Sequence, residues 1–291
     1  MRSNKKILIV TIFLFIFSIY EPIIVSESYN NISNISISLD EKLWAVIITV
    51  GEPERDNKNA GELYNILLTN GWDKNNILYI KESQATKDVI LSSPNWLEAN
   101  GADQDDFVLF YFSMHGGRKN DTLPFDEPDN LDEFIVSYKQ DDENNHILDD
   151  ELSLMFDQIQ SEKLVIVFET CYSGGMIDGT NDLRRTGRIV ITSTKEDESS
   201  YPIFLIKSWL FPYYFLKGLK GGADKNYDNI ITVEEAFEYA KIYTVKRSTI
   251  YGYLFFIFHG SLFIQHPQIY DGWPSEENNE EELKFISSAE L

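Results

Sequence analysis

The chain has 291 residues, of which 43% are hydrophobic and 25% are charged, so a wholly disordered chain is excluded. Its 47 acidic and 25 basic residues give a net charge of −22, which argues against nucleic-acid binding and against charge-driven docking on anionic lipid. The single cysteine, Cys171, excludes an internal disulfide and a cysteine-based metal cluster, so burial must hold the fold.

The first 28 residues have the pattern of a targeting segment. Basic residues at positions 2, 5 and 6 precede the apolar run Ile7–Tyr20, which is typical of a secretory signal. We expect residues 1–28 to be a signal peptide or, if uncleaved, an N-terminal membrane anchor; a buried N-terminal helix is the third reading, without capping signals. Residues 29–40 are rich in Asn and Ser and are predicted to be a linker. The expected location is extracytoplasmic, either secreted or membrane-anchored.

Residues 41–271 are predicted to form the folded domain. Fully apolar runs alternate with amphipathic stretches, which favours a mostly parallel sheet covered by helices on both faces, an α/β fold of three layers, α/β/α. Strands are expected at 43–50, 77–80, 107–112, 134–138, 164–168 and 189–192, and helices at 60–70, 87–100 with a break near Pro94, 149–160, 209–219 and 233–243. We interpret Phe255–Phe258 as another strand end, followed by His259, and residues 272–291 as a mobile acidic tail.

A histidine and the cysteine follow two of the predicted strands. Each lies three residues beyond a core run, His115 after 107–112 and Cys171 after 164–168, and each is followed by glycines. Ligands of parallel α/β sheets lie beyond the carboxyl ends of the strands, so neighbouring strands would bring the two side chains together.

These residue types suit nucleophilic catalysis. A thiolate is a strong nucleophile, and an imidazole within reach can protonate a leaving amine. The N–H groups of Cys171 and Gly116 can form an oxyanion hole. His115 precedes Cys171 by 56 residues, as in the caspase order and spacing of roughly 50. The alternatives are a cysteine that only packs in the core and a histidine with a structural role. Because both residues occupy equivalent positions beyond strand ends, catalysis is favoured.

The motifs YFSMHGG, ETCYSGG and KEDESSY resemble those of the legumain-like peptidases, within the caspase-like (caspase–hemoglobinase) fold that also includes the glycosylphosphatidylinositol transamidase catalytic subunit. The resemblance covers roughly 43–271, with Met114 as a departure from the usual pattern. It implies a mostly parallel caspase-like sheet, with His115 as general acid and base, Cys171 as nucleophile and Gly116 as an oxyanion donor. It implies no cofactor for the chemistry.

The resemblance also implies a specificity pocket. Glu169 is similar to its acidic residue, Ser199 and Ser200 to its serines, and Arg55 to its arginine, although Asp56 stands where legumains carry His. The far pocket Asp has no clear equivalent. Cleavage after Asn or Asp is one expectation, and Asp56 with Glu169 can instead favour a basic residue. The alternatives are that Glu169 caps a helix, that the serines are turn residues and that Arg55 is a solvated charge.

A twelve-residue stretch from Asp224 to Glu235 fits an EF-hand-like calcium loop. Asn229 stands at the position usually held by Gly, and Asn tolerates the left-handed backbone needed there. A helix capping box of Thr232 and Glu235 explains two of the ligands without metal. The predicted ligands of a structural Ca²⁺ are Asp224, Asn226, Asp228, the carbonyl of Ile230, Thr232 and Glu235.

The sequence therefore predicts an exported cysteine endopeptidase that acts on a peptide or protein substrate through an acyl-enzyme. Two alternatives remain: a transamidase or peptide ligase on the same residues, in which an amine replaces water, and a non-enzymatic, calcium-braced binding module. The sequence does not separate them.

Overall fold

The computed structural model describes residues 41–122, 125, 127–139, 142–179, 183–259, 263–275 and 281–287. The signal or anchor predicted for 1–28 and the linker predicted for 29–40 lie outside the described residues. Within those ranges, no helix combines the length and hydropathy needed to cross a bilayer.

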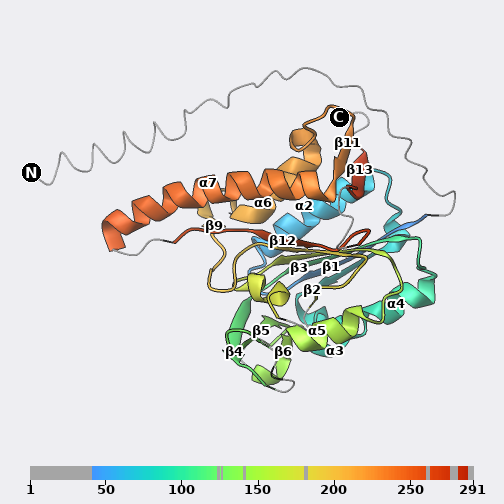
Figure 1. Ribbon diagram of the computed structural model, residues 1–291, viewed down its shortest axis with the longest axis horizontal. Coiled ribbons are helices and arrows are strands. Elements are labelled where there is room, and N and C mark those ends of the chain that lie inside the picture. The colour runs from blue at the N-terminus through green and yellow to red at the C-terminus, as the bar shows by residue number, and fades with distance from the viewer. Residues whose placement is uncertain are drawn as a thin grey trace, which may run out of the picture. The chain divides into compact units, whose positions relative to one another are not determined.

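A mostly parallel sheet forms the middle layer (Figure 1). Among the described residues it has six strands in the order β12-β8-β7-β3-β1-β2, and only the β12–β8 pair is antiparallel. The five predicted core strands are confirmed, because apolar residues on both faces suit a strand covered on both sides. The bounds are β1 Leu43–Thr49, β2 Ile77–Lys81, β3 Phe107–Ser113, β7 Lys163–Glu169, β8 Arg188–Thr192 and β12 Gln268–Asp271.

Alternate residues of each strand face two separate hydrophobic cores. In β3, Leu109 and Tyr111 belong to one core, and Phe110 and Phe112 belong to the other; all four are fully buried. One core is covered by α2 Asp56–Thr69, α6 Leu210–Lys217 and α7 Val233–His259. The other is covered by α3 Lys87–Leu91, α4 Ser93–Asn100 and α5 Asp149–Phe156, and Figure 1 shows the two helical layers on opposite sides of the sheet. The predicted three-layer α/β/α architecture is confirmed.

The break predicted near Pro94 separates α3 from α4. Ser92 lies between the two helices, and Pro94 occupies the first turn of α4, where its missing N–H costs no helical hydrogen bond. Three small sheets of the described residues lie outside the central one. Their bounds are β4 Gly116–Asn120, β5 Leu131–Val136 and β6 His146–Leu148; β9 Pro202–Ile203 and β10 Ser208–Trp209; β11 Ile230–Thr232 and β13 Lys284–Ser287.

Two predictions about the carboxyl-terminal third are wrong. The helix expected at 233–243 continues to His259, so Phe255–Phe258 is helical and not a strand end. The tail is not mobile throughout, because β13 pairs with β11 and buries Phe285 and Ile286. The stacking of Phe285 on Phe107, 5.6 Å between ring centroids, shows why: these two apolar residues complete the core within an otherwise acidic segment.

Candidate active site

The chain order of the sheet places a switch point between β1 and β3. The chain passes from β1 outward to β2, and then from β3 outward in the other direction to β7 and β8, so the crevice beyond the carboxyl ends of β1 and β3 is the expected ligand position. Strands β3 and β7 are parallel neighbours, and Ser113 pairs with Glu169 at their ends. His115 and Cys171 each lie two residues past that pair. The register therefore brings the predicted histidine and cysteine to equivalent positions on adjacent strands.

Gly116 lies directly against the cysteine segment. A Cβ atom at this position would stand 2.4 Å from Thr170 Oγ1 and 2.5 Å from the carbonyl oxygen of Cys171, closer than side-chain contacts allow. The Met114 N–H also donates to the Glu169 carbonyl, at 3.2 Å. Only glycine permits this approach, so the residue predicted as an oxyanion donor is held beside the predicted nucleophile.

Cys171 is partly buried and lies among the predicted pocket serines. Burial raises the pKa of the Cys171 thiol, while hydrogen bonds from the Ser200 N–H and the Ser199 hydroxyl oppose the rise. The side chain of His115 is exposed. A thiol with a raised pKa is mostly protonated at neutral pH, so it needs a base to become a nucleophile.

Glu169 is buried beneath the cysteine and is only 3% exposed. Burial raises its pKa to about 8, helped by the nearby carboxyl of Asp56 and opposed by hydroxyl hydrogen bonds from Ser200 and Ser193. Its Oε2 atom has no hydrogen-bond partner. A buried acceptor without a partner is costly, because it has lost its hydrogen bonds to water.

Asp56 is a second buried carboxyl group at the same crevice, and it is 2% exposed. Its Oδ1 accepts from the Ser113 hydroxyl and from Trp209 Nε1, each at 2.7 Å, and its Oδ2 accepts from the Glu52 N–H, also at 2.7 Å. Burial raises the pKa of Asp56 to about 6, although these hydrogen bonds and the charge of His115 lower it. The sequence identified Asp56 as a neighbour of Arg55 that, with Glu169, can favour a basic residue; its partner Trp209 was missed.

The guanidinium of Arg55 lies between two aromatic rings. Its Cζ atom is 5.1 Å from the ring centroids of both Phe204 and Trp209, and its Nη1 pairs with Glu52 at 2.8 Å. Stacking and pairing hold this charge at the rim, beside Asp56. The structure therefore brings Arg55 near the predicted pocket, with Glu52 already neutralising it.

The loop predicted to bind calcium lies elsewhere. It leads into β11 and the start of α7, and the partner strand β13 packs on Phe107, the first residue of β3, so the loop belongs to the amino edge of the sheet. Asp224 accepts from the Asn229 N–H at 3.2 Å, and Asn229 has the predicted left-handed backbone, with φ of 64°. Thr232 and Glu235 form the capping box. The loop is ordered by its own hydrogen bonds.

A second acidic group, missed by the sequence reading, lies beside the cysteine loop. Carboxylate oxygens of Glu127, Glu133 and Asp178 lie within 4.8 Å of one another. Burial and the neighbouring acids raise the pKa of Glu133 to about 9, and both of its oxygens are buried without hydrogen-bond partners. A hard cation such as Ca²⁺ suits an all-oxygen cage of this kind. The position of Asp178, seven residues after Cys171, is the signal that was available in the sequence.

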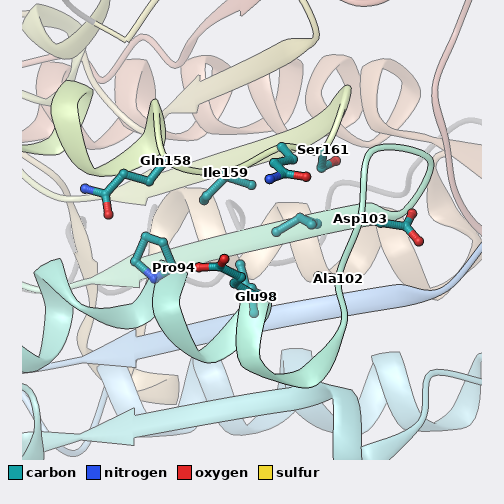
Figure 2. A pocket seen from close by; sticks show the side chains of 10 residues that line it. Pro94, Glu98, Ala102, Asp103, Gln158, Ile159 and Ser161 are labelled. Atoms are coloured by element: carbon teal, nitrogen blue, oxygen red, sulfur yellow. The ribbon is translucent and has the colours of Figure 1, made fainter.

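A hollow shown in Figure 2 lies away from these residues. It is lined where α4 leads into β3, by Ala102 and Asp103, and where α5 leads toward β7, by Ile159 and Ser161. Those segments precede the strands, so the hollow lies at the amino edge of the sheet, and its ten lining residues include no cysteine or histidine.

Histidine and cysteine beyond adjacent carboxyl ends of a parallel sheet, within an α/β/α sandwich, are the arrangement expected of the class of caspase-like cysteine peptidases. Comparison with known proteins supports this class. Residues 59–180 match the family model described as "Metacaspase, peptidase C14 domain", and the matched stretch contains both His115 and Cys171.

Two curated relatives are similar over about a third of the chain. Metacaspase-1 of Pyricularia oryzae is 39% identical over 100 residues, 33% of this chain and 24% of the relative, and Metacaspase-1 of Candida albicans is 33% identical over 124 residues, 38% and 27%. The similarity thus spans about a quarter of each relative. The crystal structure of a Geobacter sulfurreducens protein covers 79% of this chain and 92% of its own, with a TM-score of 0.54 and 14% identity, which shows a shared fold.

Proposed function

We propose that the chain is a cysteine endopeptidase in which Cys171 is the nucleophile and His115 the general acid and base. The observation that carries this proposal is the register of β3 and β7, which sets both residues two positions beyond the Ser113–Glu169 pair. The match of residues 59–180 to the peptidase C14 domain supports it.

The raised pKa of Cys171 assigns the first step to His115. The imidazole takes the thiol proton as sulfur attacks the peptide carbonyl carbon, and the oxyanion meets the N–H groups of Gly116 and Cys171. His115 then gives the proton to the leaving amine, which departs and leaves the acyl-enzyme. Water, deprotonated by His115, attacks the acyl carbon and releases the acid and the thiol.

The substrate class follows from the buried acids. Burial raises the pKa of both acids, the carboxyl of Asp56 raises that of Glu169 further, and Glu169 Oε2 lacks a partner. A lysine or arginine side chain at P1 would supply both a positive charge and hydrogen-bond donors there. An asparagine or aspartate at P1, the preference of the legumain-like branch, would leave the charges uncompensated. Cleavage after a basic residue is the better-supported specificity.

A divalent cation fits the acidic group of Glu127, Glu133 and Asp178 better than the predicted loop of Asp224 to Glu235. Both carboxyl oxygens of Glu133 are buried without partners. In the loop, one oxygen of Asp224 is also without a partner, but its other oxygen and Asp228 accept from the loop's own N–H groups. A cation there would neutralise acids that pack against the cysteine loop, because a Cβ atom on Gly175 would lie 2.0 Å from the Glu133 carboxyl. Its contribution would be structural, ordering that loop.

The N-terminal segment supports export of this peptidase. Its basic residues and apolar run are those of a secretory signal or an anchor, and the single cysteine is consistent with an oxidising compartment if it is a working nucleophile. Cell fractionation with sequencing of the mature N-terminus separates a cleaved signal from a retained anchor. A full-length, cytoplasmic product would contradict export.

Peptide hydrolysis by the purified chain tests the catalytic assignment. We expect fluorogenic peptides with Lys or Arg at P1 to be cleaved, and we expect Cys171→Ala and His115→Ala to lose activity by about 10³-fold or more. Because Cys171 is the only cysteine, loss of activity on thiol alkylation can be assigned to the sulfur atom of Cys171.

The control is Leu154→Ser, an exposed apolar position on α5, which should leave hydrolysis unchanged. Full activity of Cys171→Ala would sink the proposal. A wild-type chain that cleaves no member of a peptide library, and whose thiol alkylates at the rate of a free thiol, would instead favour the binding-module alternative.

A further inference from the structure

The carboxyl-terminal half of α7 exposes large apolar side chains. The first turns of the helix bury Phe237 and Ala240, whereas Tyr253 is 58% exposed, Phe256 50% and Ile257 72%. In Figure 1 this half of α7 extends beyond the end of α6. Spacings of three and four residues place the three exposed side chains on one helix face, and a concentrated apolar face of this kind marks an interaction surface.

Charge is segregated along the same helix. No Asp or Glu occurs between Glu238 and Asp271, and no charged residue occurs from Ser248 to Tyr270, although the chain holds 47 acids. The cations of this part of α7, Lys241, Lys246 and Arg247, all precede the apolar end. We call Tyr253, Phe256 and Ile257 the apolar tip of α7, and Lys241, Lys246 and Arg247 its basic collar. The tip is uncharged and the collar is positive, in a chain of net charge −22.

A lipid bilayer matches both the apolar tip and the basic collar. Phenylalanine and isoleucine side chains partition below the headgroups, tyrosine prefers the interface, and lysine and arginine at the collar would meet lipid phosphates. A second copy of the chain fits less well, because two bodies of charge −22 repel each other. Of the two readings of the apolar segment Ile7–Tyr20, a cleaved signal and a retained anchor, the anchor would hold the chain at the same environment.

We propose that the exposed end of α7 docks on a lipid bilayer, with Tyr253, Phe256 and Ile257 entering the interfacial layer and Lys246 contacting lipid phosphates. This is peripheral docking and not a membrane span. It is separate from the apolar N-terminal segment and does not depend on peptidase activity.

The full-length chain with Cys171→Ser offers a background without cysteine, so a label can be placed at one position. A solvatochromic fluorophore on Ile257→Cys should shift to the blue with phosphatidylcholine vesicles and be quenched by nitroxide-bearing lipids. The matched control is Leu154→Cys, a 69% exposed apolar position on α5, where neither change is expected. Because the readout is local, the N-terminal segment does not produce it.

Two outcomes would overturn the proposal. One is a label at position 257 that stays in water while the chain is bound to vesicles. The other is a label already shielded without vesicles, which shows that a second copy or another segment of the chain covers the helix; loss of that shielding on dilution identifies the second copy.

Removing the apolar tip provides an independent measurement. With the label moved to Tyr253→Cys, the pair Phe256→Ser and Ile257→Ser should lower partitioning of the label into the bilayer by about tenfold or more, and Lys246→Glu should lower it by a smaller factor. An unchanged thermal unfolding transition shows that the variants fold. Unchanged depth of the label in the double variant contradicts the docking.

Discussion

The acidic side chains at the carboxyl edge of the sheet are buried, whereas those of the loop at its amino edge lie near the surface. Asp56 and Glu169 are 2% and 3% exposed, and Glu169 keeps an oxygen without a partner. In the loop, Asp228 is exposed and accepts from the Ile230 N–H at 2.8 Å. Both regions carry carboxyl groups close in space, and each holds one buried oxygen without a hydrogen-bond partner, Glu169 Oε2 in the first and Asp224 Oδ1 in the loop. The two regions differ in how deeply their carboxyl groups are buried.

This difference in burial sets how much each region gains from a cation. Burial raises the pKa of a carboxyl group because the charged form loses its hydration, and a cation that enters the crevice recovers that cost. A surface loop whose carboxylates cap its own backbone gains less from a cation.

The largest effect is expected at Glu169. Glu169→Gln keeps the shape of the side chain and removes the charge that would meet a basic P1 residue, so kcat/KM for Lys or Arg peptides should fall by about 100-fold or more. Cleavage of peptides with Asn at P1 should change much less. Steady-state kinetics on matched peptide pairs give both values.

The matched control is Glu235→Gln in the surface loop, which should leave both values unchanged. If Glu169→Gln lowers hydrolysis of basic and asparagine peptides equally, Glu169 supports the fold of the crevice and does not select the substrate.

Binding of a basic ligand should strengthen as pH rises. Glu169 has a pKa of about 8 and Asp56 of about 6, so below those values each is neutral and must lose a proton before it pairs with a cation. Affinity for an arginine-terminated peptide, measured with Cys171→Ser, should rise by at most about tenfold per pH unit for each proton released, and level off near pH 8.

Calorimetry in buffers of different ionisation enthalpy counts the released protons directly. Affinity that falls between pH 6 and 8 would show that the two carboxyl groups do not hold the ligand. In Asp56→Asn, the component of the pH dependence of affinity that lies below pH 6 should be lost, and the component between pH 6 and 8 should remain.

A smaller effect is expected from calcium at Glu133. Its pKa is raised from 4.5 to about 9, so the folded chain keeps a proton that the unfolded chain loses, and the free energy of unfolding falls as pH rises through that window. Ca²⁺ replaces the proton, so it should raise Tm at pH 8 by about 3 °C or more relative to EDTA. Glu133→Gln should abolish the calcium response and raise Tm in EDTA. A response that survives Glu133→Gln places the cation elsewhere.

The positions of His115 and Cys171 could be read from the sequence because local patterns define them. A fully apolar run predicts a core strand, and the residue just beyond it predicts the ligand edge. The partners of Asp56 could not be read in this way. Its bond to Trp209 joins residues 153 positions apart, and only the placement of β10 beside the start of α2 creates it.

The errors in the carboxyl-terminal third have the same origin. The sequence Phe255–Phe258 before His259 has the local composition of the strand before His115, but it continues the helix that Val233 begins. Tertiary context overrides a short aromatic run, whose helix and strand preferences are similar. Phe285 and Ile286 were hidden among acidic neighbours, although the pair is buried against the core.

The smallest effect is expected at Asp228, and it decides where a cation binds. The side chain is exposed, so Asp228→Asn should change the free energy of unfolding by only about 0.5 kcal/mol or less and should leave the calcium-dependent rise in Tm intact. The EF-hand-like reading predicts the opposite, because it makes Asp228 a ligand. Differential scanning calorimetry of Asp228→Asn and Glu133→Gln, each with Ca²⁺ and with EDTA, separates the two sites. Loss of the calcium response in Asp228→Asn alone would move the cation to the amino edge, away from Cys171.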